Sequence, residues 1–338
     1  MAGSFVLVGE GSKTHPLSQP QKVRTMALSA PALSEIDLHS GDYRASISIF
    51  GGGPRALTYR GAPLLTDYPR GTHPPLSAGN VLAPWPNRVA DGVFIWDGTV
   101  QRLNITEPGR ANAIHGFVAE QNWEVVSAVE DMVTVSTQIT AQPGWPWPLG
   151  LRLRWSLDAQ QGLTGELQVT NESDVACPFG LGWHPYLSAQ GAEVSECTLT
   201  VPVTHNLPLE PIRNLPAGPE IPAERILPGI RTGVALENVW LDHCFVDRSS
   251  DLPGTRGRRE ARLVGPERRG VRLWADEAFR YFQIYTADPA RREGFPGHGR
   301  AIAVEPMTCP PDALRSGVGL IALEAGESRH FAMGIGAV

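Results

Sequence analysis

The sequence predicts an all-β protein made of many short antiparallel strands, with very little helix. Runs of alternating polar and apolar residues recur along the chain, and the clearest pair, 149–157 and 163–170, has the pattern of a hairpin. The 36 glycines and 30 prolines are spread along the chain without a repeat, as turns between short strands require. No segment keeps the 3.6-residue period of an amphipathic helix.

The remaining strands are expected where the same alternation returns between turn residues. A run over 36–50 stops at three consecutive glycines, and an Asp97-Gly98 pair divides 93–105 into the two arms of a hairpin. The segment 192–240 is rich in proline and is expected to be irregular. Further short strands are expected at 57–59, 64–65, 123–129, 132–139, 196–203, 261–264, 271–275, 281–286, 301–304, 317–323 and 330–336.

Length and composition bear on domain organisation and exclude one class of function. A chain of 338 residues suggests about two average domains, but all-β sandwiches and barrels often form one unit of this size. We expect 1–34 to be a polar, loosely ordered N-terminal extension and 35–338 to be a single domain. The net charge of −6, with no basic stripe interleaved with aromatic residues, argues against nucleic-acid binding.

The cysteines and the hydropathy pattern predict a cytoplasmic protein. The four cysteines include no C-x-x-C pair, so reduced thiols are expected instead of a zinc ribbon or a disulfide framework. No apolar run reaches the length of a membrane span, and the run at 5–8 is too short for a signal sequence. We therefore expect no membrane partner; a monomer and a homodimer are both compatible with the sequence.

One carboxylate near the C-terminus is followed by prolines that restrict the backbone. The apolar run 301–304 leads into Glu305, and Pro306, Pro310 and Pro311 follow. Because proline lacks an amide N–H, we expect the strand to end at Glu305 and a stiff loop to wrap around it. A carboxylate held on a rigid element is suited to act as a general base. A glutamate that merely ends a strand in solvent is equally compatible with this motif alone.

Two histidines occur where the chain is stiff or tightly turned. His184 lies between Trp183 and Pro185, and a proline restricts the residue before it to extended backbone angles. This places an imidazole at a strand end beside aromatic residues, where it can give or take a proton near neutral pH. His115 precedes a glycine at a predicted turn. Taken alone, a histidine such as His115 is more often structural than catalytic.

The stretch 78–92 combines a rigid aromatic residue with hydrogen-bond donors. Trp85 lies between two prolines, which should hold its aromatic ring rigidly in place. Asn87 and Arg88 follow directly. The guanidinium fork of Arg88 suits hydroxyl or carboxylate oxygens, so the pair is a candidate clamp for sugar hydroxyls. A surface arginine paired with an acid is the commoner outcome. Far along the chain, Asp242 supplies another carboxylate at the end of an apolar run.

These residues occur in five motifs whose order along the chain matches a known family. The motifs are Asn-Val-Leu-Ala-Pro-Trp-Pro-Asn-Arg (80–88), Ala-Ile-His-Gly-Phe (113–117), Gly-Trp-His-Pro-Tyr (182–186), Leu-Asp-His-Cys-Phe (241–245) and Val-Glu-Pro-Met-Thr-Cys-Pro-Pro-Asp-Ala (304–313). Together they resemble the aldose 1-epimerase (galactose mutarotase) family, in a divergent bacterial form. The resemblance runs from about residue 35 to the C-terminus, and the motif around Asp242 is its least specific part.

The resemblance implies a fold and a set of residue roles. The fold would be a large antiparallel β-sandwich that binds a monosaccharide in an open groove, without a metal or an organic cofactor. Glu305 would be the general base and His184 the general acid. The residues that hold the sugar hydroxyls would be Arg88, His115 and Asp242, with Asn87 and Trp85 beside Arg88.

The implied reaction needs only acid–base chemistry. Interconverting the α and β anomers of a hexose requires removal of the C1 hydroxyl proton and protonation of the ring oxygen, and each positioned transfer contributes roughly 10²–10⁴ in rate. One carboxylate and one imidazole suffice for these steps.

Several alternatives to this function remain open at the level of sequence. A hexose-6-phosphate substrate would need extra cations, which Arg291 and Arg292 could provide, although a solvated loop is the simpler interpretation. A sugar-binding protein without catalysis would retain the same motifs. A glycoside hydrolase would use Glu305 with Asp242, while the spacing of the acids and histidines matches no known metal-ligand pattern.

Overall fold

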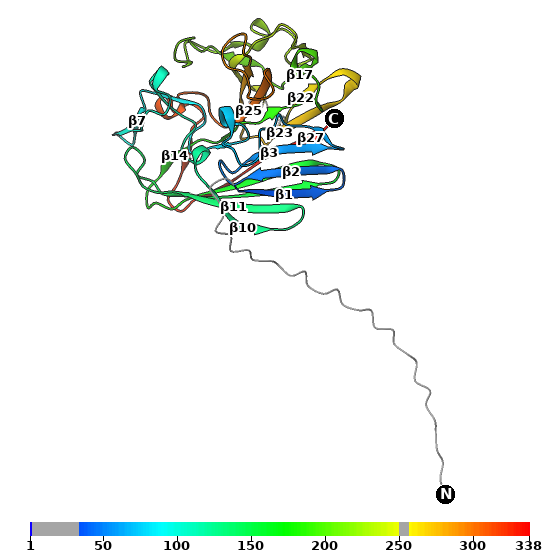
Figure 1. The fold of residues 1–338 in the computed structure, drawn as a ribbon. Coiled ribbons are helices and arrows are strands. Elements are labelled where there is room, and N and C mark those ends of the chain that lie inside the picture. The colour runs from blue at the N-terminus through cyan, green and yellow to red at the C-terminus, as the bar shows by residue number, and fades with distance from the viewer. Residues whose placement is uncertain (2–33, 250–256) are drawn as a thin grey trace.

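The computed structural model describes Met1, residues 34–249 and residues 257–338, so the predicted N-terminal extension lies almost entirely outside the described residues. Within them, the largest sheet has nine antiparallel strands (Figure 1). In spatial order these are β10 (Glu124–Ala128), β11 (Met132–Ile139), β12 (Leu149–Asp158), β13 (Gly162–Asn171), β27 (Ser328–Ala337), β23 (Gly270–Ala275), β22 (Arg259–Val264), β17 (Thr198–Thr200) and β20 (Val234–Ala235).

A second sheet, of eight strands in the described part of the chain, supplies most of the residues considered below as a site. Its long central strands, β24 and β25, pair over seven residues. In spatial order the sheet contains β19 (Ile221–Pro222), β18 (His205–Leu207), β21 (Asp242–Val246), β24 (Tyr281–Ala287), β25 (Ala301–Met307), β15 (Gly182–Trp183) and β5 (Val81–Leu82), with β16 (Tyr186–Leu187) also paired to β25.

Smaller sheets and single turns complete the described structure. A four-stranded sheet contains β1 (Glu35–Ser40), β2 (Tyr43–Ser48), β3 (Pro54–Tyr59) and β4 (Ala62–Pro63). Three strand pairs are β6 (Arg88–Ala90) with β9 (Asn112–Ile114), β7 (Val93–Trp96) with β8 (Thr99–Arg102), and β14 (Cys177–Phe179) with β26 (Ile321–Leu323). Among the described residues the only α-helix is α1 (Ala313–Ser316), and 3₁₀ turns occur at Pro75–Ser77, Pro108–Arg110, Val118–Glu120, Val194–Glu196, Ala223–Arg225 and Pro266–Arg268.

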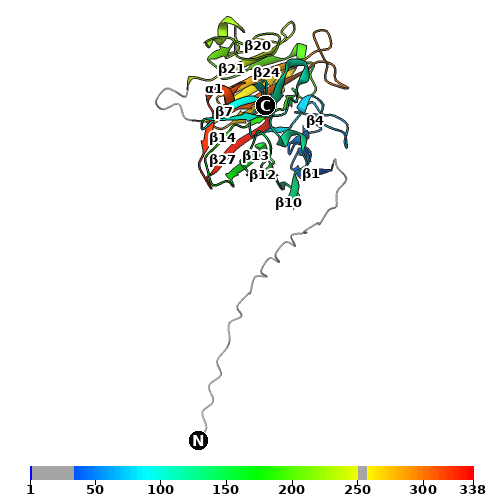
Figure 2. The same ribbon diagram turned by 90° about the vertical axis from the view of Figure 1, so that its left-hand side faces the viewer.

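Side chains from the two large sheets meet in one apolar core. On β12 the alternation seen in the sequence places Leu151, Leu153 and Trp155 inside, while Arg152 is exposed. The ring of Trp155 lies 5.4 Å from that of Trp183 on β15, so the nine-stranded sheet packs directly against the eight-stranded sheet. The rotated view in Figure 2 shows the β12–β13 side and the β21–β24 side stacked on each other. The predicted all-β antiparallel sandwich is therefore confirmed.

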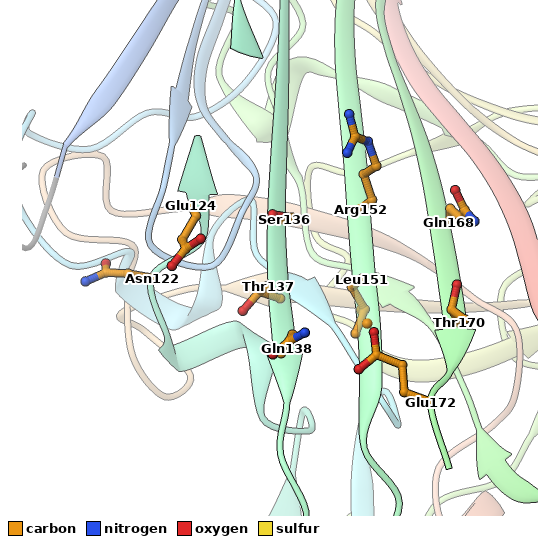
Figure 3. Close-up of a pocket in the computed structure, with 11 residues that line it drawn as sticks. Asn122, Glu124, Ser136, Thr137, Gln138, Leu151, Arg152, Gln168, Thr170 and Glu172 are labelled. Atoms are coloured by element: carbon orange, nitrogen blue, oxygen red, sulfur yellow. The ribbon is translucent and has the colours of Figure 1, made fainter. Parts of the chain in front are cut away.

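The outer face of the nine-stranded sheet is polar and hollowed (Figure 3). The strand register places Ser136, Arg152 and Gln168 side by side across three strands. Glu172 lies at one end of the hollow and is exposed. These are the polar positions of half-buried strands, whose alternate residues face solvent, so the hollow needs no functional explanation.

The strand that carries Glu305 is longer than predicted. β25 continues two residues past Glu305, which therefore lies inside a strand and not at its end. Backbone N–H groups alternate between the two sides of a strand. The N–H of Val304 donates to the carbonyl of Pro185, so the ring nitrogen of Pro306 faces the same side, where β15 and β16 are interrupted. The missing N–H of Pro306 thus removes no bond to β24, and the strand continues.

Candidate active site

One pocket brings together six of the seven residues predicted for the site. Strands β21, β24 and β25, the β15–β16 turn and the β6–β9 pair all contribute to it. Its volume of about 240 Å³ is suited to one small molecule. The residues that line it are Leu76, Ser77, Asn87, Arg88, Ile114, His115, His184, Tyr186, Asp242, Gln283, Tyr285, Arg292, Glu293 and Glu305.

Glu305 is buried in the middle of the sheet. Its side chain is only 2% exposed, and its neighbour across the ladder is Gln283 on β24. Burial raises the pKa of the Glu305 carboxyl well above its usual value, the nearby Asp242 carboxylate raises it further, and Arg88 opposes both effects. This environment favours the protonated carboxyl over the carboxylate.

His184 is fixed by its backbone and by two neighbouring rings. Its N–H donates to the carbonyl of Asn80 over 3.1 Å, and its own carbonyl accepts from the N–H of Gly79 over 2.9 Å. The imidazole stacks on Tyr186 with ring centres 5.4 Å apart and meets the edge of His115 at the same distance. Burial lowers the pKa of His184 to about 4. The imidazole therefore lies in a buried, aromatic environment.

Glu305 and His184 form a close pair in the pocket. Nε2 of His184 lies 3.4 Å from Oε1 of Glu305, a distance compatible with an ion pair. The raised pKa of the carboxyl and the lowered pKa of the imidazole both favour the uncharged forms, however. Burial therefore places the proton on Glu305 and leaves His184 neutral. Such a pair still holds one group that can donate a proton and one that can accept a proton.

His115 and Asn87 face each other in strained backbone conformations. Both adopt left-handed angles, with φ of 64° and 56°. The N–H of His115 donates to the carbonyl of Asn87, and the N–H of Asn87 donates to Nδ1 of His115. Burial, together with His184 and Arg88, holds the pKa of His115 well below its usual value. Since Nδ1 accepts a hydrogen bond, the neutral ring carries its proton on Nε2, where it can be donated to a ligand.

Arg88 is held in one orientation by a carboxylate. Nε and Nη2 of Arg88 donate to the two oxygens of Glu107 over 2.8 and 2.9 Å, a bidentate geometry. The N–H of Arg88 also donates to Oδ1 of Asn87. The proline-rich stretch that follows β25 contributes as well, because Asp312 N–H donates to the carbonyl of Arg88 over 2.7 Å. Asp312 therefore ties the strand of Arg88 to the segment that follows Glu305.

Asp242 is saturated with hydrogen bonds. Its Oδ1 accepts from Asn214 and Gln283, each over 2.8 Å, and its Oδ2 accepts from Arg292 over 3.0 Å. The side chain is 8% exposed, so the carboxylate is nearly enclosed by these donors. Asp242 is therefore held in place in the pocket lining, with its Oδ2 paired to the partly exposed Arg292.

Trp85 belongs to the core and not to the pocket. It is 3% exposed and packs against Phe117 and Trp145, with ring centres 4.9 and 5.8 Å away. Its neighbour Phe117 is partly buried and packs against the main core. Trp85 therefore packs in the core and does not line the pocket that holds the other six predicted residues.

The structure adds pocket residues that the sequence analysis did not single out. Gln283 had a weak signal, since it is a polar residue inside the apolar run 281–286. Tyr285 donates to Glu293 over 2.6 Å, and both residues line the pocket. Arg292, which was considered as a phosphate ligand, lines the pocket but pairs with Asp242. Only the strand register and the loop after β24 bring these residues to the site.

The fold and these motifs match one family. A profile of the aldose 1-epimerase family matches residues 34–336. The chain belongs to the aldose 1-epimerase family. Its relatives include the uncharacterized protein YihR of Escherichia coli K12, which is 29% identical over 297 residues, 88% of this chain and 91% of YihR.

Solved structures of this family share the fold. A putative aldose 1-epimerase from Escherichia coli K12 superposes with a TM-score of 0.74 at 24% identity, covering 90% of this chain and 99% of that chain. Galactose 1-epimerase from Lactobacillus acidophilus gives a TM-score of 0.75 at 16% identity, with 94% and 97% covered. In the described part of this family member, no helix is long and apolar enough to cross a membrane.

Proposed function

We propose that the protein is an active aldose 1-epimerase that interconverts the α and β anomers of a hexose. The proposal rests on four buried polar atoms at the pocket that have no hydrogen-bond partner among the described residues: His184 Nδ1, Tyr186 Oη, Gln283 Oε1 and Glu305 Oε2. Each such atom costs about 1–3 kcal/mol while it stays unpaired. A ligand carrying several hydroxyl groups satisfies them, and a cyclic hexose is such a ligand.

The proposed reaction uses the single proton of the Glu305–His184 pair. In the neutral pair this proton lies on Glu305, and its transfer to His184 over 3.4 Å produces a carboxylate base and an imidazolium acid. Glu305 then takes the proton of the C1 hydroxyl while His184 protonates the ring oxygen, and the ring opens. Rotation about the C1–C2 bond and the reverse transfers close the ring from the other face, so the enzyme returns to its starting protonation.

The other pocket residues would orient the sugar. The Nε2–H of His115 and the guanidinium N–H groups of Arg88 that do not bond Glu107 are donors, and Oδ2 of Asp242 is an acceptor. Since none of these groups changes protonation in the proposed reaction, their contribution is to position the hydroxyls relative to the reacting pair.

The charge pairing at the pocket favours a neutral hexose over a hexose phosphate. A phosphate group binds best to guanidinium donors that lack another anion. Arg88 is bidentate with Glu107, Arg292 pairs with Asp242, and Arg291 does not line the pocket. A glycoside hydrolase is disfavoured for a related reason, because Asp242, with three donors on its carboxylate, is poorly suited to act as the second catalytic acid or nucleophile.

Polarimetry on freshly dissolved sugars tests the proposal. The wild-type protein should accelerate the mutarotation of α-galactose or α-glucose over the spontaneous rate, and glucose 6-phosphate should respond less. The Glu305→Gln variant serves as the control for buffer and protein effects. Sugar binding without acceleration would identify a non-catalytic binding protein, and acceleration limited to the phosphate ester would overturn the assignment to a neutral hexose.

A further inference from the structure

The loop between β18 and β19 reaches the site from a region that the sequence showed only as irregular. Residues 208–217 fold back on themselves, since Leu209 and Pro216 form a bridge and Ala217 N–H donates to Pro208 O over 2.9 Å. The carboxylate of Glu210 caps the turn by accepting from two backbone N–H groups, at 2.8 and 2.6 Å. The loop therefore has a defined internal structure of its own.

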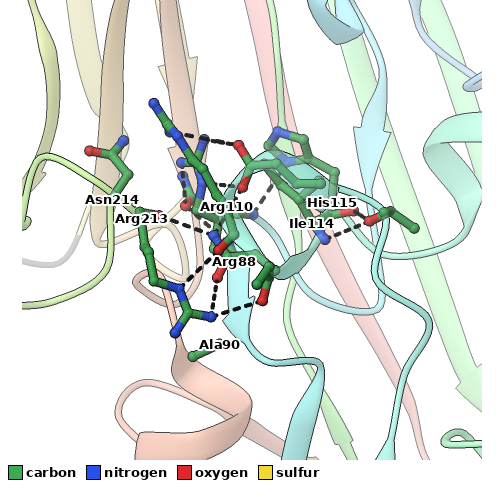
Figure 4. Close-up of polar contacts among 12 residues, drawn as sticks. Arg88, Ala90, Arg110, Ile114, His115, Arg213 and Asn214 are labelled. Atoms are coloured by element: carbon green, nitrogen blue, oxygen red, sulfur yellow. Dashed lines mark hydrogen bonds and ion pairs between the residues drawn. The ribbon is translucent and has the colours of Figure 1, made fainter.

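Arg213 attaches this loop to the β6–β9 pair. Its guanidinium donates to the carbonyls of Arg110 and Ala111 over 2.9 and 2.8 Å, and to Asp91 over 2.8 Å. In return, Nδ2 of Asn112 donates to the carbonyl of Arg213 over 3.0 Å. Figure 4 shows Arg213 reaching across to the segment that carries Arg88, Arg110 and His115.

Asn112 extends this connection to the sugar-facing side. Its Nδ2 also donates to Oε2 of Glu107 over 3.0 Å, and Glu107 is the carboxylate that orients Arg88. Asn112 is completely buried, so the connection between the loop and the Arg88–Glu107 pair is shielded from water.

Asn214, the next residue in the loop, contacts the opposite side of the pocket. Its Nδ2 donates to Oδ1 of Asp242 over 2.8 Å, and the residue is only 5% exposed. Its backbone is left-handed, with φ of 59°, a conformation that asparagine tolerates better than most residues. This turn aims the side chain of Asn214 at Asp242 while its neighbour Arg213 points the other way.

We propose that loop 208–217 is a positioning element for the sugar pocket. Arg213 anchors the loop to the strands of Arg88 and His115, and Asn214 sets the orientation of the Asp242 carboxylate. Two halves of the pocket that lie on different sheets are thus held in register by two adjacent side chains. Asn214 is a positioning residue that acts through Asp242, and the assignment rests on the proposed function only in taking Asp242 to contact the sugar.

The Asn214→Gly variant tests this assignment, because glycine keeps the left-handed backbone and deletes only the amide. We expect KM, and the Kd for galactose from calorimetry, to rise about tenfold, the effect of losing one hydrogen bond to a charged group. The turnover number should change less than about threefold, since the proton-transfer pair is untouched. Ile212→Ser is the matched control, because Ile212 lies in the same loop, is 77% exposed and should leave both constants unchanged.

A double-mutant cycle separates positioning from a general structural role. In an Asp242→Asn background, Asn214→Gly should change KM or Kd by less than about twofold, because its target is already altered. Effects that multiply independently in the two backgrounds would overturn the proposal. If Asn214→Gly does not fold, the same cycle is run with the isosteric Asn214→Asp variant.

A crystal structure of the variant tests the positioning without any activity. The Asp242 carboxylate should turn away from its present orientation or adopt two conformers. An unchanged Asp242 would contradict the proposal even in an active enzyme. A wild-type protein that fails to accelerate mutarotation would refute the proposed function, yet a reoriented Asp242 would still support the positioning role of Asn214.

Discussion

The ionisable side chains on the two sides of the pocket differ in their environments. On the side of β25 and the β15–β16 turn, Glu305 and His184 are buried, have pKa shifts that favour the neutral forms, and present polar atoms without a partner in the described part of the chain. On the side of β6–β9 and β21, the charged side chains are paired with side chains of opposite charge. Arg88 is bidentate with Glu107, and Asp242 accepts three hydrogen bonds.

Under the proposed function, this difference separates the residues that transfer the proton from those that orient the sugar. A group that exchanges a proton must not be locked to a strong counter-charge, because the ion pair would hold it in one protonation state. A group that only orients a ligand gains from such a lock, which preserves its geometry. The predictions below test this division, from the largest expected effect to the smallest.

Replacing Glu305 should affect turnover most. Glu305→Gln keeps the shape of the side chain but removes the proton-exchanging group, so kcat for mutarotation should fall by roughly 10²–10⁴, with little change in KM. Polarimetry at saturating sugar measures the loss. Glu172→Gln, on the outer face of the nine-stranded sheet, is the matched control and should retain full activity. Near wild-type turnover in Glu305→Gln would show that another residue is the general base.

The same substitution should raise stability at alkaline pH. Because the pKa of Glu305 is raised in the folded protein, its contribution to stability is full below the unfolded carboxyl pKa of about 4.5. That contribution is lost as pH rises toward the folded pKa, so Glu305→Gln should melt above the wild type at pH 8 and closer to it at pH 4. An equal difference in Tm at both pH values would show that Glu305 has an ordinary pKa.

The pH dependence of turnover should reflect a pair with one proton. His184 takes a second proton only as pH falls through about 4, so kcat/KM should stay level down to about pH 5, be about half its maximum near pH 4 and fall about tenfold per pH unit below that. Far-ultraviolet circular dichroism at each pH checks that the protein remains folded. A midpoint near 6.5 would instead indicate an unperturbed imidazole, and the dry setting of His184 would be refuted.

Breaking the Arg88–Glu107 pair should weaken binding more than turnover. Glu107→Gln leaves the guanidinium of Arg88 without its counter-charge, so KM should rise about tenfold and stability should fall by about 2 kcal/mol, less than for a fully buried pair. Calorimetric sugar binding and urea unfolding measure the two effects. Glu166→Gln removes an exposed partner of Arg154 and should change neither quantity appreciably. A large loss of kcat with unchanged KM would contradict the assignment of Arg88 to binding.

Replacing Trp85 should have the smallest effect on the KM for the sugar. Trp85→Phe removes part of an aromatic cluster, so stability should drop by about 1–2 kcal/mol while KM stays within about twofold of the wild type. Urea unfolding and polarimetry measure the two quantities. A fivefold rise in KM without loss of stability would instead indicate that Trp85 contacts the sugar.

Much of the fold could be predicted because a strand with one buried face has alternating polar and apolar residues in its sequence. The alternation of 149–157 and 163–170 is found as the β12–β13 hairpin, paired from Leu149 with Asn171 to Asp158 with Gly162. Proline was a less reliable guide. Pro306 suggested too early an end for β25, since the effect of a missing N–H depends on what lies on that side of the strand.

The sequence by itself determined the local chemistry of this protein: which strands have one apolar face, and which carboxylate and imidazole sit in stiff surroundings. Local sequence can specify these features because backbone restriction and side-chain alternation act over a few residues. The tertiary structure alone decided that Glu305 and His184 lie 3.4 Å apart, that Trp85 faces the core, and that Asn214 contacts Asp242 from a proline-rich loop. Those outcomes depend on desolvation and on contacts between segments far apart in the chain, which no local pattern records.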